Sequence, residues 1–308
     1  MTSHILVATA IESALGALLT GAILYLVLAR GGRTYHYLFA AVLLICLVWD
    51  VGIFILAVRN GRLEELPAIG FAIGLVCVLI PALLFHFACL YTGHVIKWAI
   101  TLGWILTGAV LMLGLAGLYW NVEGVHVYDW GNVFRVIPSV VDPIVMLAWF
   151  ALCLAACWLL FTAARRATSR IQRRHCLYIG SGLLVLTFAI VKAGVVYGIN
   201  VPILLPMGML LVDVFNAIIG VAIIKDRLFD ITLMVSKGTL YSILAGLLIF
   251  IYSLSEHLLV TYFGELIGGR SGLANILSIA VGVAVLMPVK QRLERRIDGY
   301  FAHKKLEF

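Results

Sequence analysis

Five polar residues lie inside long apolar stretches of the sequence, and their side chains could bind a ligand. They are Glu12, Asp50, Lys192, Asp213 and Asn216. Ionisable groups at membrane depth are costly, and they usually face a bundle interior, a charged partner or water. One interpretation is a ligand-binding pocket with Lys192 as its charged anchor. The other is a structural pair of Lys192 with Asp213 or Glu12 that holds the helices together, and the sequence favours neither.

No catalytic or metal-binding pattern accompanies these residues. The sequence lacks a nucleophile–base arrangement, a metal-ligand motif on a helix and a glycine loop that could hold phosphate. Its six cysteines lie in or beside apolar runs and form no metal-type pair. We therefore expect no enzyme activity in this chain, no metal ion and no cofactor. The net charge of +7 does not indicate nucleic-acid binding, because its meaning depends on where the charges fall.

The composition indicates the class of protein in which such residues lie. The chain of 308 residues is 63% hydrophobic and 12% charged, whereas soluble domains carry about 25% charged residues. A helix needs about 20 apolar residues to cross the hydrocarbon core of a membrane. Runs of this kind predict an all-α integral membrane protein with about nine transmembrane helices, near residues 5–29, 37–58, 68–91, 98–118, 142–163, 176–197, 203–224, 239–263 and 272–289. Pro81 lies within the third run and predicts a kink there.

Lysine and arginine residues in the connections predict the orientation. Seventeen of them fall on one side of the membrane and four on the other, while Lys192 lies within a helix. We expect the richer side to be cytoplasmic, which places the N-terminus outside and the basic C-terminus in the cytoplasm. The long outer connection from Tyr119 to Val141 is rich in aromatic residues. We interpret it as an aromatic belt at the membrane interface, with a cap over an external cavity as the alternative.

This orientation gives the buried charges a common depth. Glu12, Asp50, Lys192 and Asp213 lie about five to ten residues inward from the outer ends of the first, second, sixth and seventh helices. That separation corresponds to roughly 8–15 Å at a helical rise of about 1.5 Å per residue. Asn216 follows Asp213 by one helical turn and so shares its face. The four helices could therefore bring these residues together in one cavity in the outer half of the bundle.

The connections divide the chain into four parts. We expect residues 1–224 to form a seven-helix membrane bundle, 225–237 a cytoplasmic interfacial joint, 238–289 a two-helix transmembrane hairpin and 290–308 a basic cytoplasmic exit helix. Apolar residues alternate with charged ones in the joint and recur at helical spacing in the exit helix. The residues expected to couple the bundle to the exit are Lys225, Arg227, Phe229, Asp230, Arg295 and Arg296.

Several segments resemble a known family. The run AIIKDRLFDI at 222–231, the helix pair after it and RRIDGYF at 295–301 are similar to the membrane sensor regions of bacterial histidine kinases with a seven-helix N-terminal module. The run FACLYTG at 87–93 is similar to that module's Phe-Ala-x-x-Tyr-Thr-Gly pattern. The resemblance implies a multi-pass protein of the bacterial cytoplasmic (inner) membrane that works in a two-component system. It also implies a homodimer, surrounded by membrane lipids, that passes an external or membrane-borne cue to a cytoplasmic kinase or other output domain.

The chain departs from this family in one respect. It ends at Phe308 without the phosphoacceptor histidine motif or the ATP-binding glycine boxes of a kinase. We expect either a sensor fragment or a stand-alone relative with a separate output partner. The leading expectation is a non-enzymatic sensory and signal-transducing module. An accessory subunit of a larger membrane complex is the first alternative. A proton-coupled transporter is the second, and the lack of visible repeats and of matching helix breaks counts against it.

Overall fold

The computed structural model describes residues 4–226 and 228. Seven helices in this part are long and apolar enough to cross a membrane, at Ile5–Ala29, Thr34–Val58, Leu66–Thr92, Lys97–Leu115, Val141–Arg166, Arg170–Val196 and Leu204–Ile223. Each overlaps one of the first seven predicted spans, so the prediction of a seven-helix membrane bundle is confirmed. The predicted eighth and ninth helices and the exit helix lie outside the described residues.

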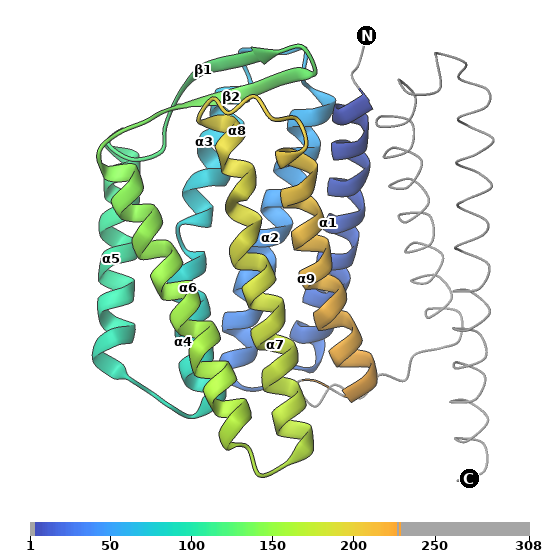
Figure 1. The fold of residues 1–308 in the computed structure, drawn as a ribbon, viewed down its shortest axis with the longest axis vertical. Coiled ribbons are helices and arrows are strands. Elements are labelled where there is room, and N and C mark those ends of the chain that lie inside the picture. Colours follow the sequence, from blue (N-terminus) through green and yellow to red (C-terminus); the bar gives the residue numbers. More distant parts are fainter. Residues whose placement is uncertain (1–3, 227, 229–308) are drawn as a thin grey trace, which may run out of the picture. The chain divides into compact units, whose positions relative to one another are not determined.

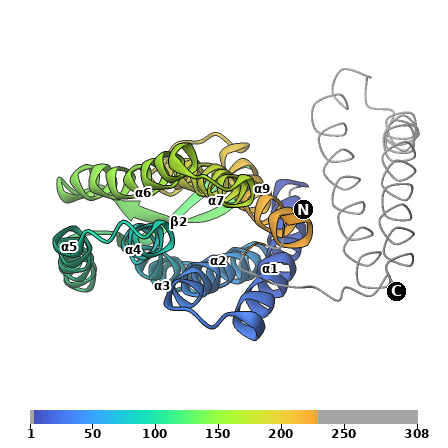
Figure 2. The ribbon, with the colours of Figure 1, turned by 90° about the horizontal axis from the view of Figure 1, so that it is seen from below.

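The seven spans are arranged in two rows. In chain order the elements are α1 (His4–Arg30), α2 (Thr34–Val58), α3 (Leu66–Cys77), α4 (Ile80–Thr92), α5 (Lys97–Leu115), β1 (Asn121–Tyr128), β2 (Gly131–Ile137), α6 (Val141–Arg166), α7 (Arg170–Phe188), the 3₁₀ turn η1 (Ala189–Lys192), α8 (Ala193–Val196) and α9 (Leu204–Asp226). One row holds α1 to α4 and the other holds α6, α7 and α9 (Figure 2). The rows join where α1 packs against α9 and where α4 packs against α6, while α5 lies at the edge beside α4.

The interior between the rows is filled by apolar side chains. Phe39, Phe87 and Phe215 are completely or almost completely buried, and they join α2, α4 and α9. The ring centre of Phe39 lies 5.2 Å from that of Phe87 and 6.3 Å from that of Phe215. Large apolar side chains on α5 and α6, such as Trp98 and Leu147, are exposed on the outside of the bundle. This distribution suits a bundle whose outer surface contacts lipid.

The third span is interrupted between Cys77 and Ile80. Pro81 has no N–H for the carbonyl one turn earlier, and its ring crowds that carbonyl. The two residues between α3 and α4 donate instead to carbonyls three residues back, at 3.3 and 3.2 Å. The kink predicted at Pro81 is therefore confirmed as a short break in the helix.

The sixth span is interrupted as well, which the sequence did not lead us to expect. Its regular helix α7 ends at Phe188, and the chain continues as the 3₁₀ turn η1 and the single turn α8. Lys192 is the last residue of η1. A 3₁₀ turn is narrower than an α-helix and changes the direction in which side chains point.

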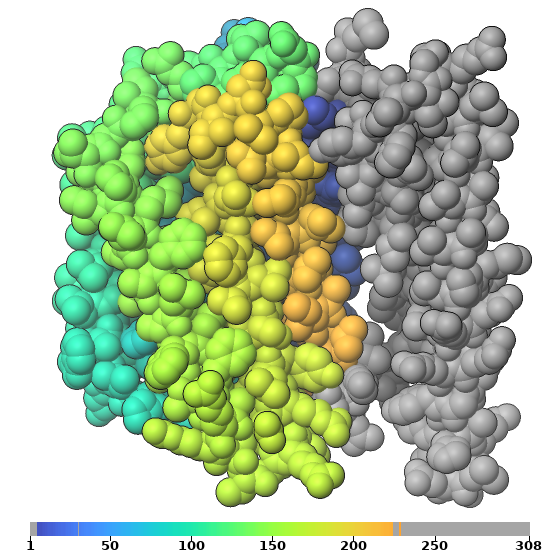
Figure 3. All heavy atoms as spheres, in the orientation of Figure 1, coloured from blue at the N-terminus to red at the C-terminus, as the bar shows by residue number. Residues whose placement is uncertain are grey.

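The connection between α5 and α6 forms a β-hairpin, an element that the all-α expectation did not include. Strands β1 and β2 pair antiparallel, with Tyr128 opposite Gly131 and Asn121 opposite Ile137. The hairpin lies across one end of the bundle (Figure 1), and in the space-filling view its side chains and those around α8 fill that end of the visible face (Figure 3). The opposite end carries the connection between α6 and α7. Exposed arginines there are Arg165, Arg166, Arg170, Arg173 and Arg174.

Candidate functional site

A buried polar cluster lies between α1, α2 and α9. We define the polar cluster as Glu12, Thr20, Asp50, Asp213 and Asn216, of which none is more than 7% exposed. The amide nitrogen Nδ2 of Asn216 donates to Oγ1 of Thr20 at 2.8 Å, and Oγ1 of Thr20 donates to Oδ2 of Asp50 at 3.2 Å. One chain of hydrogen bonds therefore connects α9 through α1 to α2.

Gly16 on α1 makes room for two of the carboxylates. A Cβ atom at Gly16 would lie 2.8 Å from Oδ1 of Asp213 and 3.2 Å from Oδ2 of Asp50. The side chains of Asp50 and Asp213 therefore both approach the backbone of α1 at Gly16. Glu12 and Thr20 lie one turn before and one turn after Gly16, and Glu12 lies within electrostatic range of Asp213. The structure therefore places Glu12, Asp50 and Asp213 near one another, whereas a common cavity with Lys192 in the outer half of the bundle stays a prediction.

Several acceptor atoms of the polar cluster have no hydrogen-bond partner among the described residues. They are Oε2 of Glu12, Oδ1 of Asp50, Oδ2 of Asp213 and Oδ1 of Asn216, and all four atoms are buried. Buried polar atoms in folded proteins are nearly always hydrogen-bonded. The polar cluster therefore has more acceptors than its own donors can satisfy.

Lys192 lies beside the polar cluster but contacts an aromatic ring. It is 8% exposed, and its ammonium nitrogen Nζ lies 4.2 Å from the ring centre of Trp49 and 3.8 Å from Sδ of Met209. Gly208 on α9 gives space to the aliphatic part of the side chain, because a Cβ there would lie 2.5 Å from Cβ of Lys192. Within the described part of the chain, no carboxylate forms an ion pair with Lys192. The direct pair with Asp213 or Glu12 that the sequence allowed is therefore not formed there.

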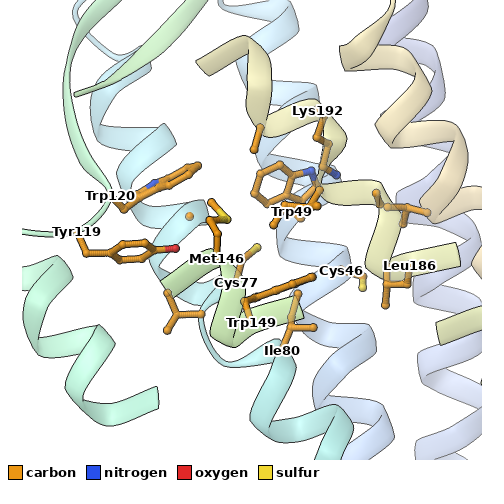
Figure 4. Close-up of a pocket in the computed structure, with 16 residues that line it drawn as sticks. Cys46, Trp49, Cys77, Ile80, Tyr119, Trp120, Met146, Trp149, Leu186 and Lys192 are labelled. Carbon is orange, nitrogen blue, oxygen red and sulfur yellow. The ribbon is translucent and has the colours of Figure 1, made fainter. Parts of the chain in front are cut away.

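An apolar cavity of about 100 Å³ lies on the other side of Trp49 and Lys192. An engineered cavity of about 150 Å³ holds a molecule as large as benzene, so this space is of the right order for a small ligand. Its wall includes Cys46, Trp49, Cys77, Ile80, Tyr119, Trp120, Met146, Trp149, Leu186 and Lys192 (Figure 4). Of the five residues predicted to bind a ligand, only Lys192 lines this cavity, and the other four belong to the polar cluster behind it.

The connection between α5 and α6 lines the cavity at the point where it leads into the β-hairpin. Tyr119 and Trp120 come from the start of this connection, and both are 5% exposed. Trp120 packs its indole ring on Gly74 of α3 and donates from Nε1 to the carbonyl of Gly70 at 3.1 Å. Phe134 of β2 packs on Gly70 in the same way. These aromatic side chains are buried rather than facing lipid. Their burial contradicts the interpretation of these residues as an aromatic belt and favours a cap over a cavity, whose external location stays a prediction.

Hydrogen bonds attach the hairpin to three neighbouring segments. Asn60, just beyond α2, exchanges three hydrogen bonds of 2.6 to 2.9 Å with Asn132 of β2. Tyr128 donates to the carbonyl of Val195 in α8 at 3.0 Å, and burial raises the pKa of Tyr128. Trp130 donates to Oδ1 of Asn200 at 2.9 Å. The hairpin is thus a fixed cover over the bundle.

Sequence reasoning missed Gly16, Thr20 and Trp49, although one signal was available. Glu12, Gly16 and Thr20 are spaced by four residues and therefore share a helix face. Trp49 gave no comparable signal, because tryptophan in an apolar helix faces lipid or protein equally well. Of the residues expected to couple the bundle to the exit, Lys225 lies in the last turn of α9. Arg227, Phe229, Asp230, Arg295 and Arg296 lie outside the described residues.

Comparison with known proteins places the whole bundle in one family. Residues 13–232 match the family model described as the N-terminal 7TM region of histidine kinase. No match to a curated protein or to a solved structure was found. The match covers more than half of the chain, and seven spans are what the described residues contain. The chain therefore belongs to the family of N-terminal seven-transmembrane regions of histidine kinases.

Proposed function

We propose that this chain is the receiving part of a membrane sensor, which binds a small ligand in the cavity beneath the β-hairpin. The family indicates a multi-pass membrane sensory module with a cytoplasmic kinase as its output partner. The observation that carries the ligand proposal is the aromatic cavity, with Trp49 and Lys192 in its wall and the polar cluster close to them.

The wall of the cavity favours a small, mainly apolar or aromatic ligand. Trp49, Tyr119, Trp120 and Trp149 offer ring faces and edges for such a molecule. Lys192 is the charged group in this wall, and its ammonium could donate to one polar atom of the ligand. Ligand sites commonly combine an apolar lining with a few polar groups that orient the ligand.

The response would travel from the hairpin end to the arginine-rich end. A ligand that displaces Trp49 or Lys192 would act on α2 and η1, and so on α9, which packs against η1. We include in this proposal that the change passes on through residues 225–237 to the basic exit at 290–308. Such a response requires that the ligand bind more tightly to one arrangement of the helices than to the other. The outside location of the hairpin, the bacterial inner membrane and a homodimeric state belong to the same proposal.

Thermal unfolding of the purified chain in lipid nanodiscs tests the ligand site. Benzene, phenol and indole should raise the melting temperature of the wild-type protein, because a ligand that binds only the folded state stabilises it. Ala193 lines the cavity, so Ala193→Leu should remove this effect. Ala151→Leu, on the exposed side of α6, is the matched control and should retain it. A panel without any stabilising compound, or an unchanged response in Ala193→Leu, would contradict the proposal.

A crosslink tests the coupling step. Joining cysteines introduced at Lys225 and Lys237 should prevent any ligand-dependent change in the activity of the kinase partner. The reduced form of the same variant is the control and should respond. A crosslinked protein that responds like the reduced one would show that the joint does not relay the signal.

Transport remains a second candidate because of the interrupted helices. The sequence argued against a transporter partly by the lack of helix breaks, yet both the third and the sixth spans are interrupted. Interrupted spans near buried charges occur in many secondary transporters. A proton-coupled flux of small aromatic compounds into liposomes containing the chain would favour transport over sensing.

A further inference from the structure

The polar cluster carries more negative than positive groups. Glu12, Asp50 and Asp213 are three carboxyl groups, whereas Lys192 is the one cation near them in the described part of the chain. Unbalanced charge in the interior of a membrane bundle is strongly unfavourable. The ammonium of Lys192 is moreover directed at Trp49 rather than paired with a carboxylate. Either a bound cation or protons on the carboxyl groups must therefore neutralise the polar cluster.

Asn216 supplies an independent observation in favour of a cation. Its side chain is 1% exposed, and its amide nitrogen already donates to Thr20. The amide oxygen Oδ1 is consequently held inside the polar cluster, where no described residue donates to it. An amide oxygen can only accept hydrogen bonds or coordinate a cation. Oδ1 of Asp50 and Oδ2 of Asp213 are likewise buried and have no hydrogen-bond donor among the described residues.

The carboxylates of Asp50 and Asp213 also approach the same point on α1. Gly16 has no side chain where a Cβ would lie against both Asp50 and Asp213. Carboxylate, amide and hydroxyl oxygens form the ligand set that hard cations prefer. Among the described residues, no three His, Cys, Asp or Glu side chains are grouped for a metal ion. A cation at this place would be surrounded by two carboxylates, an amide oxygen and a hydroxyl oxygen, with water completing its ligands.

We propose that Asp50, Asp213 and Asn216 bind a hard inorganic cation, Na⁺ or Ca²⁺, between α1, α2 and α9, with Thr20 and Glu12 beside it. None of these five residues lines the aromatic cavity. The cation site is thus separate from the proposed ligand site and does not depend on it. A cation held here would connect the first, second and seventh spans and fix the surroundings of Trp49 and Lys192.

Thermal unfolding at constant ionic strength tests this proposal. Replacing choline chloride by NaCl, and in a second arm adding CaCl₂, should raise the melting temperature of the purified wild-type protein saturably in one of the two arms, by at least about 2 °C. Asp50→Asn and Asp213→Asn should abolish the rise. Glu123→Gln, an exposed carboxylate on β1, is the control and should preserve it.

A direct measurement of cation binding tests the site even if the asparagine variants do not fold. The cation that raises the melting temperature, Na⁺ or Ca²⁺, should bind to the wild-type protein in radioactive form. Gly16→Ala should weaken this binding at least tenfold, because the added methyl group would lie against an oxygen of each carboxylate. A wild-type protein whose melting temperature depends on pH but on neither cation would overturn the proposal, since protons would then balance the polar cluster. An equal cation effect in the asparagine variants would overturn it too.

Discussion

The ammonium nitrogen of Lys192 lies 4.2 Å from the ring centre of Trp49, so a cation rests on an aromatic face inside the membrane bundle. A double-mutant cycle of Lys192→Met and Trp49→Leu should give a coupling energy of about 1 kcal/mol, as expected for a cation–π contact. The free energy of unfolding in detergent is the measured quantity. The cycle of Lys192→Met with Trp149→Leu, another tryptophan of the cavity wall, is the control. Equal coupling in the two cycles would contradict a specific contact with Trp49.

Thr20→Val should destabilise the bundle by about 1 kcal/mol, because it removes both hydrogen bonds that connect Asn216 to Asp50. Thr9→Val is the matched control on the same helix. Thr9 is equally buried, but its hydroxyl donates to the carbonyl of Ile5 in its own helix. The control should therefore leave the free energy of unfolding nearly unchanged. Similar losses in both variants would show that the connection through Thr20 contributes nothing specific.

Gly74→Ala should weaken the attachment of the hairpin, because the new methyl group would occupy the position of the Trp120 indole ring. Overpacking of this kind costs about 1–3 kcal/mol. Gly108→Ala in α5 has open space around the new methyl group and should be neutral or stabilising. Thermal unfolding followed by tryptophan fluorescence measures both. A stable Gly74→Ala protein with unchanged fluorescence would mean that Trp120 does not pack there.

Asn132→Ala should speed amide hydrogen exchange throughout β1 and β2. It removes the side-chain contribution to the contact with Asn60, which costs about 1–2 kcal/mol of local stability. Asn121→Ala in the same hairpin is the control, because Asn121 has no side-chain hydrogen bond within the described part of the chain. Mass spectrometry of exchanged peptides reads out both variants. Unchanged exchange in the Asn132 variant would show that the strands are held mainly by their other contacts.

Cysteine labelling of intact cells tests the orientation. A membrane-impermeant maleimide should modify Asp129→Cys at the hairpin tip and should leave Thr168→Cys, between α6 and α7, unmodified until the cells are opened. Both positions are exposed, and the arginines around Thr168 favour the cytoplasmic side. The wild-type chain, whose cysteines are buried or partly buried, provides the background. The reverse labelling pattern would contradict the proposed topology.

The seven spans could be predicted because the signal for each is local. A run of about 20 apolar residues is sufficient to cross the membrane, whatever the rest of the chain does. The convergence of Glu12, Asp50 and Asp213 followed from counting residues along helices, since the helical rise converts position into depth. Pro81 acted locally too, through its missing N–H group.

The cap and the cavity could not be predicted because they depend on distant pairs. An aromatic connection has the same composition whether it faces lipid or protein. Trp120 and Phe134 can pack against α3 because Gly74 and Gly70 in that helix have no side chains. The 3₁₀ turn at Ala189–Lys192 contains neither glycine nor proline, so no residue in the sequence indicated a break in the helix there. The direction of Lys192 follows from that turn.

The fixed hairpin limits how this bundle can move. Its two paired strands are bound to Asn60 beyond α2 and to Val195 in α8, and Trp120, just before β1, is bound to Gly70 in α3. The hairpin therefore acts as a cross-brace over spans two, three and six. The braced ends cannot spread apart without breaking several hydrogen bonds at once. Motion of these three spans that reaches the arginine-rich end is therefore expected to consist of rotation or tilting about the braced ends, with the largest displacement at the end farthest from the brace.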